Sequence, residues 1–259
     1  MLLAIDVGNT QTVIGLFDKN DMLGSWRMVT PRYETSDEIA SKIYSFIRNS
    51  GLDPEEIKDI SVSCVVPRIV EEIQKMSKKY FGIKAFMVEE GIETGLIIDY
   101  DNPSEIGADR IANSIAAKEL YGCPAIIVDF GTATTLDILS KEGHYLGGII
   151  APGIEISSEA LFSIAAKLSK VDLYWPDSVI GRNTADCMRS GILYGFMGQV
   201  EFIIKKVIEE RRKESPDFSP KIIATGGLSF LIKEKSDLIE IFDPDLTIKG
   251  LKILISKNK

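Results

Sequence analysis

Residues 125–139, AIIVDFGTATTLDIL, indicate the fold most clearly. An apolar strand ends at Asp129, a turn follows at Gly131-Thr132, and a second strand with alternating apolar residues completes the unit. Residues 2–17, LLAIDVGNTQTVIGLF, repeat this plan, with Asp6 near the end of the first strand. Because the same strand-turn-strand unit occurs in both halves, the sequence predicts a duplicated protein whose two halves face each other.

Both turns have the composition of a phosphate-binding loop. Glycine lets the backbone approach a ligand closely, backbone N–H groups point into the turn, and Thr or Asn side chains add further donors. The carboxylates of Asp6 and Asp129 would repel phosphate, so we expect a cation such as Mg²⁺ to lie beside them. Two ordinary hairpins would use the same residue types, because Asp, Gly, Asn and Thr are common in turns.

Composition and charge exclude several classes of protein. The 259 residues are 45% hydrophobic and 26% charged, which is typical of globular proteins, and the net charge of −8 argues against a nucleic-acid partner. The three cysteines are far apart and show neither a disulfide framework nor the spacing of a zinc site. No apolar run reaches the roughly 18 residues of a membrane span, and no basic leader precedes the first strand, so we expect a cytoplasmic protein without a membrane partner.

The first half reads as an α/β lobe with a mixed sheet, which we place at residues 1–106. Thr35 and Glu38 have the spacing of a capping box, so a helix is expected to begin there. Pro67 suits the first position of a second helix. The expected elements after the first hairpin are strands at 22–29, 57–66 and 85–88 and helices at 35–48 and 67–80.

The second half, residues 107–259, begins where the chain crosses between the lobes at 96–110. Gly107 directly precedes an expected helix at 108–120, so Asp109 and Arg110 fall in a first helical turn. Asp109 could simply complement the helix dipole, or the pair could supply a base and an anion-binding group. The other elements expected here are a strand at 145–153, a helix at 154–166, a strand at 221–225 and an αβα ending at 230–234, 238–242 and 246–255.

A long helix is expected from about residue 185 to residue 213, with Thr184 as its N-cap. Gly191, Gly195 and Gly198 indicate close backbone approach, so the helix should be buried over much of its length. The charged residues at 209–214 indicate a solvated helix end. His144 is the only histidine and lies in a hairpin with glycine nearby, so we interpret it as a surface turn residue.

The sequence has no P-loop, no protein-kinase motifs in register and no dinucleotide-binding fingerprint. Paired phosphate turns nevertheless suit phosphoryl transfer, which needs positioning, charge neutralisation and a group that orients the nucleophile. Asp6, Asp109 and Asp129 could divide these tasks.

At this point the chain resembles the type III pantothenate kinase family, within the superfamily that includes acetate kinase, sugar kinases and actin. The resemblance covers essentially the whole chain, and NPSEIGADR with DFGTATT and GRNT is its most specific part. The motifs that carry it are DVGNT at 6–10, NPSEIGADR at 102–110, DFGTATTLD at 129–137, YLGGIIAPG at 145–153, GRNT at 181–184, TGG at 225–227 and FDPDLTIKGL at 242–251.

The resemblance implies a two-lobed actin-like ATPase (ribonuclease H-like) fold, in which duplicated mixed sheets carry flanking helices. It implies ATP-dependent phosphorylation of pantothenate to 4′-phosphopantothenate, the first step of coenzyme A biosynthesis. Mg²⁺ would accompany ATP, and a monovalent cation, K⁺ or NH₄⁺, would be required. A homodimer would share the substrate pocket across its interface.

The resemblance also implies roles for individual residues. Asp109 would be the general base, Asp129 would bind the monovalent cation, and Asp6 would lie in the Mg²⁺ environment. The residues that would bind pantothenate are Tyr100, Gly107, Ala108, Asp109, Arg110 and, from the partner subunit, Thr184. The residues that would bind ATP are Asp6, Val7, Gly8, Asn9, Thr10, Gln11, Thr12, Val13, Gly131, Thr132, Gly226 and Gly227.

Two alternatives stay open. Another small-molecule kinase of the same superfamily would keep the turns at Asp6 and Asp129 but would not need Tyr100, Asp109-Arg110 and Thr184 in this combination. A non-catalytic regulator that binds a nucleotide or pantothenate would need no carboxylate to orient a nucleophile.

Overall fold

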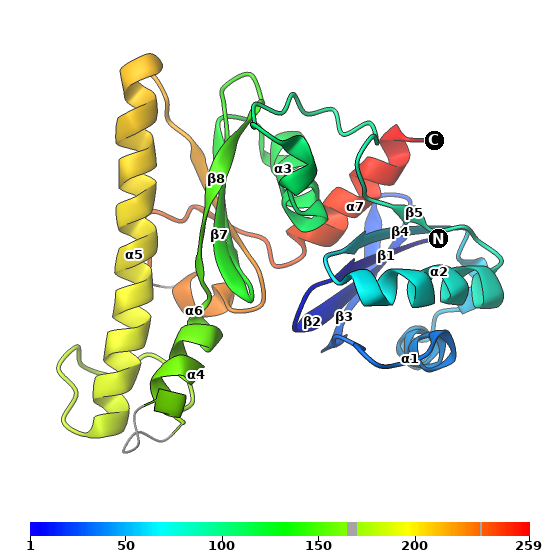
Figure 1. The fold of residues 1–259 in the computed structure, drawn as a ribbon, viewed down its shortest axis with the longest axis horizontal. Helices are drawn as coiled ribbons and strands as arrows, with labels where there is room; N and C mark the ends of the chain where they lie inside the picture. Colours follow the sequence, from blue (N-terminus) through cyan, green and yellow to red (C-terminus); the bar gives the residue numbers. More distant parts are fainter. Residues whose placement is uncertain (165–169, 234) are drawn as a thin grey trace. The chain divides into compact units, whose positions relative to one another are not determined.

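The computed structural model of the protein describes residues 1–164, 170–233 and 235–259. Within these ranges the strands form two five-stranded sheets, ordered β3-β2-β1-β4-β5 and β8-β7-β6-β9-β10 (Figure 1). The first sheet contains β1 (Leu2–Val7), β2 (Gln11–Asp18), β3 (Asp21–Val29), β4 (Asp59–Cys64) and β5 (Phe86–Met87). The second contains β6 (Ala125–Phe130), β7 (Ala133–Leu139), β8 (Tyr145–Pro152), β9 (Lys221–Thr225) and β10 (Ile241–Phe242).

The two sheets have the same topology. Strand β1 pairs antiparallel with β2 and parallel with β4, and β6 pairs in the same way with β7 and β9. Asp6 and Asp129 occupy matching places, because each lies on the central strand of its sheet between an antiparallel and a parallel neighbour. The predicted duplication and the α/β class with mixed sheets are therefore confirmed.

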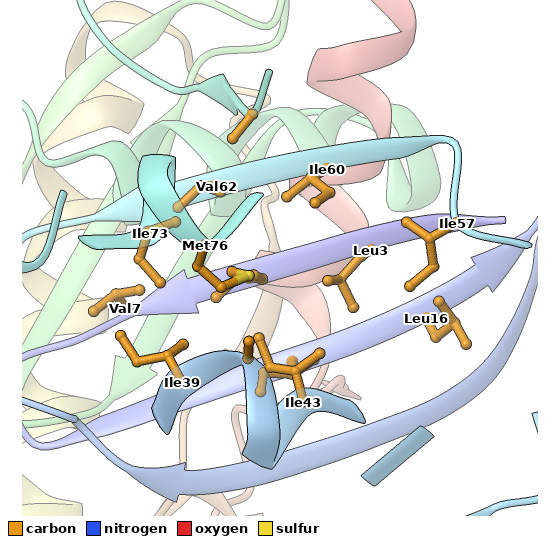
Figure 2. Packing of buried hydrophobic residues seen from close by; sticks show 14 of the residues in the cluster. Leu3, Val7, Leu16, Ile39, Ile43, Ile57, Ile60, Val62, Ile73 and Met76 are labelled. Atoms are coloured by element: carbon orange, nitrogen blue, oxygen red, sulfur yellow. The ribbon is translucent and has the colours of Figure 1, made fainter. Parts of the chain in front are cut away.

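One face of the first sheet forms an apolar core. Leu3, Val7, Leu16 and their neighbours pack against helices α1 (Ser36–Asn49) and α2 (Pro67–Phe81), as Figure 2 shows. The predicted capping box is present, since the Thr35 hydroxyl accepts from the Glu38 amide and the Glu38 carboxylate accepts from the Thr35 amide. The backbone N–H groups of Thr35 and Glu38, at the start of α1, therefore both have hydrogen-bond partners.

The opposite face of the first sheet carries small residues. Strand alternation places Ala4, Gly15 and Ser61 on this face, where helix α7 (Leu246–Lys257) packs. A Cβ on Gly15 would overlap the Ile248 side chain, and the Ser61 hydroxyl donates to the Leu251 carbonyl at 2.9 Å. Small side chains on this face therefore let the last helix of the chain approach the first sheet closely.

The second sheet also builds its own core. Ile126, Val128 and Phe130 of β6 pack with residues of α4 (Ile154–Ile164), α5 (Thr184–Glu214) and α6 (Ser229–Lys233). The other helical segments are α3 (Ala108–Tyr121) and the short 3₁₀ segments Pro54–Glu56 and Pro103–Glu105. The expected end of the helix at 154–166 lies partly outside the described residues, as does residue 234 of the expected segment 230–234.

The contacts divide the chain differently from the expected boundary between residues 106 and 107. One compact unit contains Met1–Leu96, Asp101–Ala116 and Asp245–Lys259, and the other contains Ile97–Tyr100 and Ala117–Pro244. Helix α7 covers the small-residue face of the first sheet although it comes last in the chain, which is why the contacts group it with the first unit.

Helix α5 differs from its prediction in two ways. Asn183, not Thr184, is the N-cap, because its side chain accepts from the Asp186 amide at 2.9 Å, and Thr184 is the first helical residue. Most of the 31-residue helix is not buried, and Phe202 is 61% exposed. Only part of α5 therefore packs into the core of the second sheet. The charged end of the helix is exposed, as predicted.

Candidate functional site

The first candidate phosphate turn joins β1 to β2. The Gly8 amide donates to the Gln11 carbonyl at 3.0 Å, and a Cβ on Gly8 would lie 2.9 Å from that carbonyl oxygen. A larger residue would push the turn open, so glycine is required by close backbone approach. Asn9, Thr10 and Gln11 remain exposed around this turn, where their polar groups are accessible to a ligand.

Thr30 and Arg32 hold this turn by hydrogen bonds, and the sequence analysis did not name either residue. The Thr30 hydroxyl donates to the Gly8 carbonyl at 2.6 Å, and the Thr30 amide donates to the Thr10 carbonyl at 2.9 Å. The Arg32 guanidinium donates to the Asn9 carbonyl at 2.7 Å, so a positive charge lies beside a turn suited to anions. These contacts join residues about twenty positions apart, and no local pattern in the sequence indicates them.

Asp109 lies where the sequence placed it, in the first turn of α3. Its Oδ1 accepts from the Arg110 amide at 2.8 Å. Burial raises the pKa of the Asp109 carboxyl above its ordinary value, and this hydrogen bond and the Arg110 charge only partly oppose the rise. A carboxylate with a raised pKa beside a buried arginine is suited to accept a proton from a hydroxyl.

The backbone of Gly107 lies close to the carboxylate of Asp109. A Cβ at Gly107 would overlap Oδ1 of Asp109, and the carboxylate would have to move. The glycine before the helix therefore leaves the space that the acidic side chain occupies. The expected assignment of Gly107 to the same site as Asp109 thus has a steric basis, whereas the ligand itself remains a proposal.

The second candidate turn gathers residues from separate parts of the second unit. Gly226 has a φ of +91°, and a Cβ there would overlap Oδ1 of Asp129, so the Gly226-Gly227 turn lies directly against the Asp129 carboxylate. Gly153 lies against the carbonyl oxygens of Gly131 and Thr132, where its own Cβ would overlap them. The structure therefore places Gly131 and Gly226 next to the Asp129 carboxylate, and Gly153 next to Gly131-Thr132.

The chemistry of the Asp129 site fits an oxygen-bound cation. In the described ranges, no three His, Cys, Asp or Glu side chains form a group that could hold a metal ion. The single Asp129 carboxylate beside the Gly131 and Gly226 turns instead suits K⁺ or a similar ion, or one that also binds phosphate oxygens. The same reasoning applies to Asp6, which could contact an ATP-bound Mg²⁺ only as one ligand among several.

The remaining predicted site residues, Tyr100 in a loop and Thr184 in a helix, belong to the second unit. Tyr100 lies beside Gly147, and its ring centroid is 6.2 Å from that of Tyr145. Thr184 begins α5 and lines a groove of about 610 Å³ together with Gly191 and Gly195. The expected substrate residues are thus divided between the units, because Gly107, Ala108, Asp109 and Arg110 belong to the first.

Several solved structures share this fold along nearly the whole chain. A Campylobacter jejuni protein described as a Baf family transcriptional activator is 23% identical, with a TM-score of 0.59 and coverage of 99% of this chain and 98% of that one. A 2-dehydro-3-deoxygalactonokinase protein from Sinorhizobium meliloti is 10% identical, with a TM-score of 0.59 and coverage of 98% and 96%. The ethanolamine utilization protein EutJ of Carboxydothermus hydrogenoformans is 15% identical, with a TM-score of 0.54 and coverage of 97% and 89%.

The duplicated five-stranded sheets, with the same strand order in each, define the class as a duplicated α/β fold that these solved structures share. A comparison with family models assigns the chain to one family. The family model for type III pantothenate kinase matches residues 2–206, and the chain belongs to that family. Among the described helices, none is both long and apolar enough to cross a membrane.

Proposed function

We propose that the protein transfers the γ-phosphoryl group of ATP to the hydroxyl group of pantothenate. The product would be 4′-phosphopantothenate, and the reaction would be the first step of coenzyme A biosynthesis in the cytoplasm. The observation that carries the proposal is the Asp109 carboxyl, whose raised pKa and position at the start of α3 suit a group that receives the hydroxyl proton. Membership of the pantothenate kinase family supports the choice of substrate.

In this proposal Asp109 orients the pantothenate hydroxyl and accepts its proton. The transition state of phosphoryl transfer is loose, so orientation contributes more than early proton removal. Arg110 is 8% exposed and supplies a fixed positive charge beside this carboxylate. Tyr100, Gly107 and Ala108 would complete the pantothenate pocket.

The two glycine turns would hold the phosphates of ATP. Residues 6–13 would bind them in the first unit, and Gly131, Thr132, Gly226 and Gly227 would do so in the second. Bound Mg²⁺ would neutralise phosphate charge, with Asp6 in its environment, and bound K⁺ or NH₄⁺ would lie at Asp129. The support for Asp129 is its position directly against the Gly226 turn, in a chain whose net charge of −8 otherwise opposes an anionic substrate.

We infer that the active form is a homodimer formed through α5. A Cβ added at Gly191, Gly195 or Gly198 would meet nothing within 4 Å among the described residues, so close packing in the described part of the chain does not explain these glycines. They lie along the exposed helix whose N-terminal half lines an apolar groove with Thr184. A second copy seated in this groove would bring Thr184 to the subunit boundary, which agrees with its proposed contact to the partner's substrate.

The test is ATP-dependent phosphorylation of pantothenate by the purified protein, followed by the mass of the product. We expect product with Mg²⁺ and K⁺ or NH₄⁺, and much less without the monovalent cation. Asp109→Asn should lower turnover by about 10²- to 10⁴-fold while nucleotide binding persists. Asp129→Asn should weaken activation by the monovalent cation more than it weakens binding of pantothenate.

Other outcomes would favour the alternatives. Phosphorylation of a sugar or another small hydroxyl compound, with pantothenate unchanged, would indicate another kinase of the superfamily. Nucleotide or pantothenate binding by folded dimer without any turnover would indicate a regulator. Wild-type turnover by Asp109→Asn would remove Asp109 from the mechanism.

A further inference from the structure

Tyr145, at the start of β8, holds the segment that carries Tyr100. The Tyr145 amide donates to the Ile97 carbonyl at 2.8 Å, and the Tyr145 carbonyl accepts from the Asp99 amide at 2.9 Å. Ile98 forms a parallel bridge with the same residue. These contacts extend the edge of the second sheet by a few residues and end directly before Tyr100.

The side chain of Tyr145 is fixed at its far end as well. Its hydroxyl donates to Oδ1 of Asp137 at 2.7 Å, and both residues are 0% exposed. A buried carboxylate is costly without hydrogen-bond donors, and a bond to a charged acceptor is stronger than a neutral one. Since Asp137 lies on β7, a rigid strand, this bond determines where the Tyr145 ring lies.

The fixed ring in turn contacts Tyr100. The two ring centroids are 6.2 Å apart and the planes meet at 62°, an edge-to-face arrangement. On a second side, a Cβ added at Gly147 would lie 3.7 Å from Cδ2 and Cε2 of Tyr100, so the ring faces this glycine at a distance at which a side chain there would touch it. Gly147 has a φ of +116°, a conformation that other residues rarely adopt.

We propose that Tyr145, held by Asp137, is a positioning residue that fixes the Tyr100 ring for binding of the pantothenate substrate. This inference rests on the proposed function, because Tyr100 is assigned to the substrate only there. Asp137 and Tyr145 act through Tyr100 and have no role in phosphoryl transfer itself. Their loss should therefore change affinity for pantothenate and leave the use of ATP unchanged.

Steady-state kinetics of Tyr145→Phe provide the test. We expect the KM for pantothenate to rise about three- to tenfold, the effect of one lost hydrogen bond, while kcat and the KM for ATP stay within about twofold. Tyr121→Phe is the matched control, because the Tyr121 hydroxyl also donates to a buried aspartate, Asp243, at 2.7 Å in the same unit. It should leave all three constants unchanged.

Two further variants separate positioning from a loss of stability. Asp137→Asn keeps an oxygen that can accept from Tyr145 and should keep the wild-type KM for pantothenate. If Tyr145→Phe fails to fold, the double variant Asp137→Leu with Tyr145→Phe removes both polar partners at smaller cost and should show the raised KM. An unchanged KM for pantothenate in a folded variant without the Tyr145 hydroxyl would overturn the proposal.

A spectroscopic readout distinguishes failure of this inference from failure of the proposed function. In protein labelled with 3-fluorotyrosine, the ¹⁹F resonance of Tyr100 is identified by its absence in Tyr100→Phe. Tyr145→Phe should shift this resonance, and Tyr121→Phe should not. An unmoved Tyr100 resonance would contradict the positioning role, whereas a moved resonance in a protein that does not phosphorylate pantothenate would contradict only the proposed substrate.

Discussion

At the scale of single residues, Asp109 has a cost to stability that matches its proposed task. Because burial raises the pKa of its carboxyl above 3.8, the folded protein binds the proton more tightly than the unfolded chain does. The ionised form therefore lowers the free energy of unfolding, and this loss grows as the pH rises above the ordinary value. A site selected only for stability would not keep a carboxylate here.

Asp109→Asn should therefore be more stable than the wild type at pH 7, although it loses turnover. The difference should shrink toward zero as the pH falls below about 4, where the unfolded chain also binds the proton. Urea unfolding at pH 7 and at pH 4 measures both values. Asp101→Asn, at an exposed neighbouring carboxylate, is the control, and a variant less stable than the wild type at pH 7 would contradict the expected sign.

Gly107→Ala tests the position of the same carboxylate. The added methyl group would overlap Oδ1 of Asp109, and the carboxylate can rotate away, so the protein should fold. Since displacement of a reacting group by about 1 Å can cost about 10²-fold, turnover should fall by roughly that factor. Ser104→Ala, in the exposed segment just before, should retain full turnover, and equal activity in both variants would contradict the steric account.

At the scale of elements, helix α5 forms where the sequence predicts a helix, but less of it is buried than the sequence predicts. Its three glycines indicated close approach, but a Cβ added at any of them would meet nothing within 4 Å among the described residues. Glycine in a helix interior costs about 1 kcal/mol relative to alanine, so three of them in a solvated helix lower its stability. A second helix packed against this face would offset that cost.

Gly195→Arg should prevent the proposed dimer, because a long charged side chain would fill the apolar groove that Gly195 lines. Light scattering after size exclusion should give the mass of one chain for this variant and of two chains for the wild type. Glu210→Arg, at the exposed charged end of α5, should remain dimeric. A monomeric wild-type protein, or a dimeric Gly195→Arg variant, would contradict an interface at this groove.

At the scale of the whole molecule, the order of elements along the chain differs from their order in the compact units. The chain builds the first sheet, passes to the second unit, and returns with α7 to the first. Gly250 of α7 lies so close to Ala112 of α3 that a Cβ would overlap the Ala112 carbonyl. The first unit is therefore complete only when the last residues are present.

Gly250→Ala should lower the free energy of unfolding by about 1–3 kcal/mol, since overpacking against a backbone carbonyl forces the two helices apart. Ser256→Ala is the control, because it replaces a small residue at an exposed position of the same helix. It should be neutral or slightly stabilising. Denaturant unfolding of both variants gives the comparison, and equal stabilities would show that α7 can shift freely.

The amino-acid pattern alone determines the features that depend on neighbours in the chain. Apolar runs specify β1 and β6, apolar and alternating residues specify β2 and β7, the spacing of Thr35 and Glu38 specifies a capped helix, and the repeat of an acidic strand end before a glycine turn specifies the duplication. These features follow from periodicity and turn chemistry over a few residues. The positions of Asp109 and Gly107 at the start of α3 follow in the same way.

Only the tertiary structure decides which distant residues meet. The return of α7 to the first sheet, the contacts of Thr30 and Arg32 with the Gly8 turn, and the contact of Tyr145 with Tyr100 join residues from 22 to 233 positions apart. Such contacts depend on the small side chains that let elements approach and on buried polar groups that need partners. A short stretch of sequence contains only one of the two residues in such a contact. The contact is therefore determined by the assembled fold.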